Sequence, residues 1–176
     1  MPEPHPFIAY LHNLASKEDR GALAALRRGL GQPPGTVPAM YPYVVPWLPV
    51  DARPWQEAAY YLVAALFALH PDPGGAGNLG ASFRLAEAKE GGSAADERVS
   101  AVERRFTALL SVHPDDLPDY LRQAIGFLRS KEVPVDWHQL FQDIQNWGHP
   151  AHRVQREWAR AYWGRAPETE QVKEKE

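Results

Sequence analysis

Apolar residues recur at three- and four-residue spacing through most of this 176-residue chain. No segment alternates apolar and polar residues over the length of a strand, so the pattern that would bury one face of a β-sheet is missing. The longest uncharged apolar stretch, residues 58–69, is too short to cross a bilayer and indicates a buried central helix. The sequence therefore predicts an all-α protein.

Segments rich in proline and glycine separate the expected helices, which we place at residues 7–14, 20–30, 54–69, 78–86, 96–112, 115–130, 137–147 and from Pro150 to the Trp163 region. Residues 37–50 contain four prolines and can form only short helical turns. The break at Gly91-Gly92-Ser93 predicts two stacked helical subdomains, residues 1–92 and 93–165. The second is expected to be a four-helix bundle, followed by a charged, solvated tail at residues 166–176.

Helical periodicity also predicts which side chains form the core of the second subdomain. In residues 96–112 the apolar face comprises Val99, Val102, Phe106, Leu109 and Leu110. In residues 115–130 it comprises Leu117, Tyr120, Leu121, Ala124 and Leu128. The tryptophans at 137, 147 and 158 have the spacing of core residues, which leaves base stacking as an alternative only for Trp55 and Trp163.

Composition limits the classes of function. The chain has no cysteine, which excludes disulfides and thiolate metal sites and agrees with a reducing, cytoplasmic location. Met1 is followed by Pro-Glu-Pro-His-Pro, without the apolar run of a signal peptide, and we expect no contact with a membrane. The net charge is −3, but the tail contributes −2 of it, so positive charge can still gather on individual helix faces.

Arginine outnumbers lysine fourteen to five, and arginine binds phosphate in a bidentate manner. Numbered at 100° per residue, Arg153, Arg156 and Arg160 lie on one side of the last helix together with His149. Arg122 and Arg129 are seven residues apart and share a side of their helix. The candidate nucleic-acid-binding residues are Arg27, Arg28, Arg53, Arg104, Arg105, Arg122, Lys131, Arg153, Arg156 and Arg160. Each such face could equally be ordinary solvated surface.

No catalytic constellation stands out, and we expect neither enzymatic activity nor a cofactor. Ser82 lacks the strand and the second glycine of a nucleophile elbow, and the glycines at 74, 75 and 77 are not followed by Gly-Lys-Ser/Thr. The alternative is a small helical metalloenzyme in which His149, His152 and a carboxylate bind zinc or iron. Nothing on the same helix supplies the further ligand that a metal would need, so we predict no metal site.

Four segments in order resemble the CasB family, the small α-helical subunits of the type I-E Cascade surveillance complex of CRISPR systems. They are Ala25-Leu26-Arg27-Arg28; residues 58–69 with Asn78-Leu79-Gly80-Ala81-Ser82-Phe83; residues 97–110 with residues 116–122; and Val135-Asp136-Trp137 with Trp147-Gly148. The resemblance covers about residues 11–163. It does not cover the proline-rich segment 37–50 or the acidic tail, and His149-Pro150 stands where the family pattern would have a basic residue.

The resemblance implies a non-catalytic subunit that works in antiviral defence. A pair of copies would lie along the guide RNA–target DNA duplex, beside the backbone and large subunits, and would help to hold the displaced strand of the R-loop. Basic residues of the family correspond to Arg28, Arg53, Arg105, Arg122 and Lys131, and Arg153 and Arg156 match the basic stretch after Trp-Gly. A pure protein scaffold, whose arginines pair with acidic groups of partner proteins, is the remaining alternative.

Overall fold

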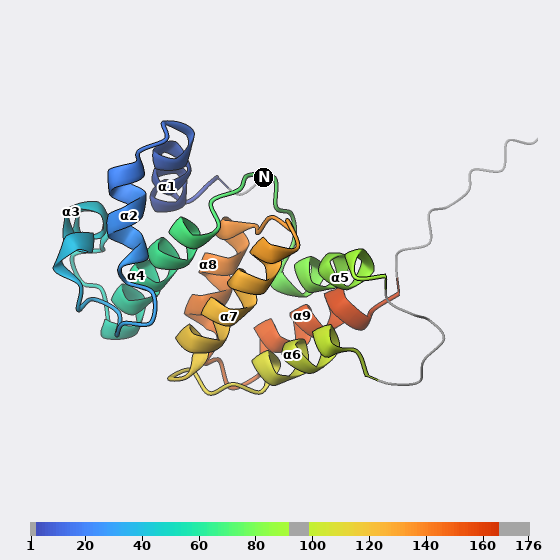
Figure 1. The fold of residues 1–176 in the computed structure, drawn as a ribbon. Helices are drawn as coiled ribbons and strands as arrows, with labels where there is room; N and C mark the ends of the chain where they lie inside the picture. Colours follow the sequence, from blue (N-terminus) through green and yellow to red (C-terminus); the bar gives the residue numbers. More distant parts are fainter. Residues whose placement is uncertain (1–2, 92–98, 166–176) are drawn as a thin grey trace, which may run out of the picture.

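The computed structural model describes residues 3–91 and 99–165, and within these ranges it contains helices and no strands (Figure 1). The all-α prediction is confirmed. The α-helices are α1 (Pro6–Ser16), α2 (Arg20–Arg27), α3 (Tyr41–Val44), α4 (Pro54–Leu69), α5 (Leu79–Lys89), α6 (Ala101–Leu110), α7 (Leu117–Ser130), α8 (Trp137–Asn146) and α9 (Arg153–Trp163). Two short 3₁₀ helices, η1 (Pro38–Met40) and η2 (Val45–Trp47), flank α3 in the proline-rich segment, where short turns were expected.

The central helix α4 is buried on most of its circumference, as its apolar sequence predicts. Pro54 occupies its first turn, where a missing N–H costs nothing. α4 packs against α2 on one side and against α7 and α8 on the other. It therefore joins the N-terminal helices to the rest of the molecule, and the buried apolar residues form one cluster.

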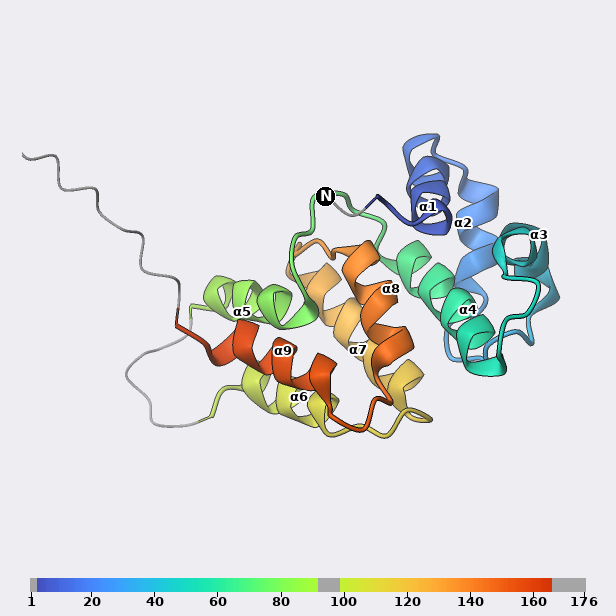
Figure 2. The same cartoon turned by 180° about the vertical axis from the view of Figure 1, so that it is seen from behind.

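α5 does not pack with the subdomain to which the sequence assigned it. It was assigned to the N-terminal subdomain, but its neighbours are α9, α6 and α7 (Figures 1 and 2). The contact between α5 and α9 depends on Gly80, where an added Cβ atom would lie 2.0 Å from the carbonyl oxygen of Trp158. The predicted boundary at residue 92 and the tail at 166–176 lie outside the described residues.

α8 and α9 are joined by a buried carboxyl group. Asp143 accepts hydrogen bonds from the indole nitrogen of Trp158 (2.7 Å) and from the side-chain amide of Gln139 (2.9 Å). Burial raises the pKa of Asp143, and the two hydrogen bonds partly oppose that shift. Trp158 is thus fixed in the core by a polar contact as well as by packing.

Several predicted helix limits and core positions are wrong. α2 ends at Arg27 instead of residue 30, because the chain turns toward Gly31, whose φ is +73°. α6 begins at Ala101, where the Ser100 side chain accepts the N–H of Glu103; residues 96–98 lie outside the described part. Val99 therefore precedes the helix and is 53% exposed, and Tyr120, predicted as core, is 39% exposed.

The last helix also begins later than predicted. His152 adopts a left-handed conformation (φ 47°) immediately before α9, so the helix starts at Arg153 and not at Pro150. His149 consequently lies before the helix and does not continue its basic row. None of the helices in the described ranges combines the length and hydropathy needed to cross a membrane.

Candidate nucleic-acid interface

α7 presents a basic side to solvent. Its apolar residues Leu117, Leu121, Ala124, Ile125 and Leu128 are buried, which leaves Arg122 and Arg129 exposed two turns apart. The guanidinium of Arg122 lies over the loop after α2: a methyl group on Gly31 would come within 2.5 Å of its Nη1 atom. Arg122 therefore connects the surface of α7 with the C-terminal end of α2.

A second cationic group gathers around Phe127. The guanidinium carbon of Arg105, from α6, lies 5.0 Å from the centre of the Phe127 ring, and the ammonium of Lys131 lies 5.9 Å from it. Lys131 also forms an ion pair with Glu90 (2.7 Å), so its charge is partly neutralised within the protein. Arg105 is fixed by an aromatic ring while its own charge stays available to a ligand.

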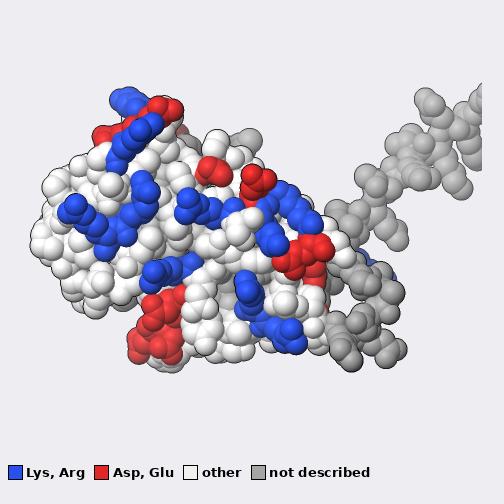
Figure 3. Space-filling model, in the orientation of Figure 1, with Lys and Arg blue, Asp and Glu red and all other residues white. Residues whose placement is uncertain are grey.

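We call the surface made by Arg105, Arg122, Arg129 and Lys131 the α7 face. Figure 3 shows basic side chains spread over α2, α6 and α7 in a single view. Arg27 and Arg28, at the end of α2, are exposed as well. The structure thus brings basic residues of α2 to the same side of the molecule as those of α6 and α7, which lie much later in the sequence.

The basic row of α9 lies elsewhere. Arg153, Arg156 and Arg160 are exposed on the side of α9 opposite to Val154, Trp158 and Tyr162, which are buried. Figure 2 shows α9 and α8 in front, whereas α6 and α7 are in front in Figure 1. The α9 row is therefore a second basic surface and does not continue the α7 face.

Besides Arg27 and Arg28, two candidates belong to neither group. Arg53 is exposed immediately before α4, where its backbone N–H donates to the side-chain oxygen of Gln56 (3.0 Å). Arg104 is exposed on α6 next to Arg105. Among the residues that the structure describes, no contact directs either side chain toward the α7 face.

Comparison with known proteins decides the family. A model of the family "CRISPR-associated protein Cse2" matches residues 22–163. The chain is 39% identical over 172 residues to the CRISPR-associated protein Cse2 of Thermus thermophilus, which covers 97% of this chain and 95% of the relative. This chain belongs to the Cse2 family.

Solved structures agree with that assignment. A crystal structure of a Cse2 family protein from Thermus thermophilus is similar, with a TM-score of 0.76 and 35% identity over 94% of this chain and 100% of the other. A chain in a solved CRISPR RNA-guided surveillance complex is also similar, with a TM-score of 0.73 and 31% identity over 89% of this chain and 88% of the other. A crystal structure of CasB from Thermus thermophilus is similar as well, with a TM-score of 0.78 and 34% identity over 94% of this chain and 100% of the other. These matches confirm the resemblance to CasB.

The arginines of this Cse2 family member are available to an anionic ligand. Within residues 3–91 and 99–165, no arginine has a carboxylate oxygen within 4.0 Å, and Lys131 is the one candidate in an ion pair. Exposed guanidinium groups with no internal partner can bind phosphate without first breaking an ion pair.

The histidines of the metalloenzyme alternative have structural roles. His149 accepts the backbone N–H of Ala151 at its Nδ1 atom (3.1 Å), and His152 is the left-handed residue before α9. Among the described residues, no three His, Asp or Glu side chains are placed to hold one metal ion. The geometry gives no support to a metal centre at these histidines.

Sequence reasoning noticed the shared side of Arg122 and Arg129 but left Arg129 out of the candidate set. It also missed Phe127, which supports Arg105 and Lys131. The spacing of Arg122 and Arg129 on one helix was a usable signal. The contact between Arg105 and Phe127 joins two helices and has no counterpart in the sequence pattern.

Proposed function

We propose that this chain is a non-catalytic, cytoplasmic subunit of a CRISPR Cascade surveillance complex in antiviral defence. It contacts guide RNA and target DNA and helps to hold the displaced strand of the R-loop. Backbone and large subunits of the complex and a second copy of this chain are its expected protein partners. The similarity to a chain of a solved RNA-guided surveillance complex supports its place in such an assembly.

The observation that carries the nucleic-acid role is the α7 face. Its arginines come from α6 and α7, are exposed and have no carboxylate partner among the described residues. Dispersed arginine contacts bind phosphates irrespective of base sequence, which suits a strand of arbitrary sequence. Because the guide–target duplex is about as stable as the DNA duplex that it replaces, modest contacts to a released strand can shift the balance.

The test is R-loop formation by the assembled complex at several salt concentrations. The variant Arg105→Gln/Arg122→Gln removes two cations from the α7 face. The control Lys17→Gln/Arg20→Gln removes the same charge from an exposed segment in which Glu18 and Asp19 stand between the two cations in sequence. Both variants change only exposed side chains, so both should fold.

We expect the α7-face variant to weaken R-loop formation and to reduce the slope of log K against log salt by about 1.4 to 1.8 for each copy of the chain in the complex, the value for two phosphate contacts per copy. The control should leave the slope within about 0.3 of the wild type. Equal slopes for the two variants would contradict phosphate binding by the α7 face and would favour a pure scaffold.

A further inference from the structure

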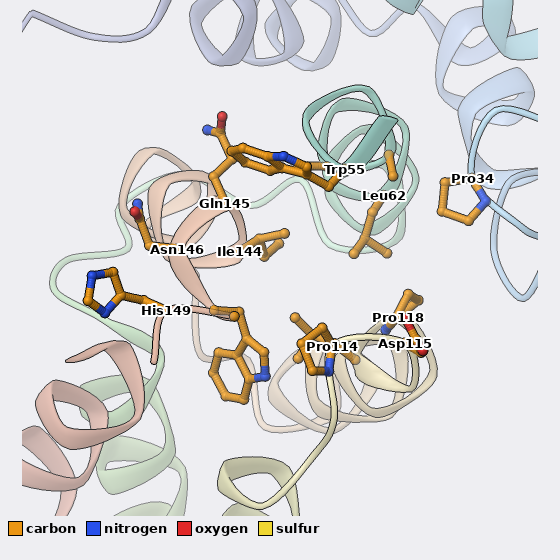
Figure 4. Close-up of a pocket in the computed structure, with 15 residues that line it drawn as sticks. Pro34, Trp55, Leu62, Pro114, Asp115, Pro118, Ile144, Gln145, Asn146 and His149 are labelled. Carbon is orange, nitrogen blue, oxygen red and sulfur yellow. The ribbon is translucent and has the colours of Figure 1, made fainter. Parts of the chain in front are cut away.

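A groove lies between α4 and the facing ends of α7 and α8. Its volume is about 610 Å³, and its walls include Pro34, Trp55, Leu62, Pro114, Pro118 and Ile144 (Figure 4). We call it the Trp55 groove. The Trp55 ring lies at one wall, Pro114 and Pro118 at the opposite one, and Asn146 and His149 at a third side. The space is large enough for one or two large side chains of a ligand.

Trp55 is the strongest apolar feature of this groove. It sits in the first turn of α4 and is 50% exposed, although most of that helix is buried. A half-exposed tryptophan in an apolar recess is the kind of residue that dominates the binding energy of protein interfaces. The α7-face proposal gives Trp55 no role.

The fixed charge that lines the groove itself comes from one aspartate. Asp115 is the one charged residue among the described residues that line it. A smaller adjoining cavity of about 300 Å³ shares Asp115 and Pro118 with it and adds Asp119 and Arg122. Figure 3 shows acidic side chains gathered over the end of α7, apart from most of the basic ones.

This charge selects the class of ligand. A nucleic-acid strand in the groove would bring its phosphates toward Asp115 and Asp119, which repel them. A protein segment with a lysine or arginine would be attracted by the same carboxylates. Asn146 is exposed at the groove; its amide nitrogen donates to the carbonyl of Gln142 (2.8 Å), and among the described residues no hydrogen bond uses its side-chain oxygen, which can accept a peptide N–H.

We propose that the Trp55 groove binds a segment of another protein subunit of the surveillance complex. The segment inserts a large apolar side chain against Trp55 and places a lysine or arginine near Asp115 and Asp119. This inference rests on the proposed function, since it needs the chain to act within a complex. The α7 face then binds nucleic acid, and the Trp55 groove binds protein.

The direct test places the photo-crosslinking residue p-benzoylphenylalanine at position 55 of the full chain in the reconstituted complex. We expect a crosslink to a different protein subunit, at a site with lysine or arginine within about five residues. A crosslink to RNA or DNA, to a second copy of this chain, or to no subunit at all would overturn the proposal.

A second measurement is the affinity of the fluorescently labelled chain for the complex that lacks it. Trp55→Ala should weaken this affinity by about thirtyfold, whereas Trp163→Ala, the control at an exposed tryptophan of α9, should change it by less than about twofold. Asp119→Lys should weaken it by about tenfold, with Asp51→Lys as the exposed control. If the groove variants had the same affinity for the complex as their controls, protein binding by the Trp55 groove would be refuted.

The two proposals fail in distinguishable ways. If the wild-type chain does not join the complex at all, the proposed function is wrong. If it joins and the groove variants match their controls, the groove proposal alone is wrong. The salt slope of R-loop formation, which the α7 face determines, should be unaltered by Trp55→Ala once enough chain is added to saturate the complex.

Discussion

Replacing Gly80 by alanine tests the close packing of α5 on α9. An added Cβ atom would lie 2.0 Å from the carbonyl oxygen of Trp158 and 2.8 Å from its carbonyl carbon, whereas ordinary contacts begin near 3.4 Å. The obstacle is the backbone of a neighbouring helix, so it cannot rotate away as a side chain could. The two helices would have to separate by about 1.4 Å.

Separation would loosen the layer in which Phe83 of α5 and Trp158 and Tyr162 of α9 are buried. Overpacking of this kind costs about 3 kcal/mol, and the better helix propensity of alanine offsets up to about 1 kcal/mol. We expect a net loss of about 2 kcal/mol in the free energy of unfolding. For a protein of this size, that lowers Tm by about 4–8 °C.

Calorimetric or circular-dichroism melting measures the change. The matched control is Gly126→Ala in α7, where an added Cβ atom meets nothing within 4 Å. That variant should gain about 0.5–1 kcal/mol and melt slightly above the wild type, because alanine favours the helix. If Gly80→Ala melted at or above the wild-type temperature while Gly126→Ala behaved as expected, the contact between the α5 and α9 backbones would be refuted.

Three further predictions concern titratable and polar groups. Burial raises the pKa of Asp143 in the folded state, so the wild type should lose stability relative to Asp143→Asn as pH rises above the ordinary pKa of aspartate. The measurement is Tm of both proteins from pH 3 to 7. Parallel curves of Tm against pH would contradict this prediction. Burial and the proximity of His138 lower the pKa of His12, so the folded wild type should lose stability as pH falls below 6.5. The variant His12→Gln should lose less stability over the same pH range. Equal losses in the two proteins would refute this prediction. The hydroxyl of Tyr162 donates to a carboxylate of α5 at 2.7 Å, so Tyr162→Phe should cost about 1–2 kcal/mol in urea denaturation, and a neutral result would count against that bond.

The local pattern of apolar residues predicted which segments form helices. It predicted the first and last residues of these helices less well. The predicted helix at residues 54–69 is confirmed at both ends, because Pro54 and the loop after His70 are strong local signals. The last helix was misplaced at its start because proline at 150 also favours a helix N-terminus. The left-handed conformation of His152 then delays α9 to Arg153.

For the candidate site too, the sequence predicted one property of the residues and not another. Exposure of the arginines could be predicted from helical periodicity, and all nine candidate arginines are exposed. Their grouping could not, because it depends on how helices cross. The α9 row and the α7 face, for example, occupy different surfaces.

By itself, the sequence determined the all-α class, the buried central helix and the family, because these depend on local periodicity and on the order of motifs. Only the tertiary structure decided that α5 packs on α9, that Arg105 of α6 lies over Phe127 of α7, and that the α9 row and the α7 face lie on different surfaces. Such contacts join residues far apart in the chain, and their geometry is set by close packing between helices, at places such as Gly80 where no side chain keeps the backbones apart.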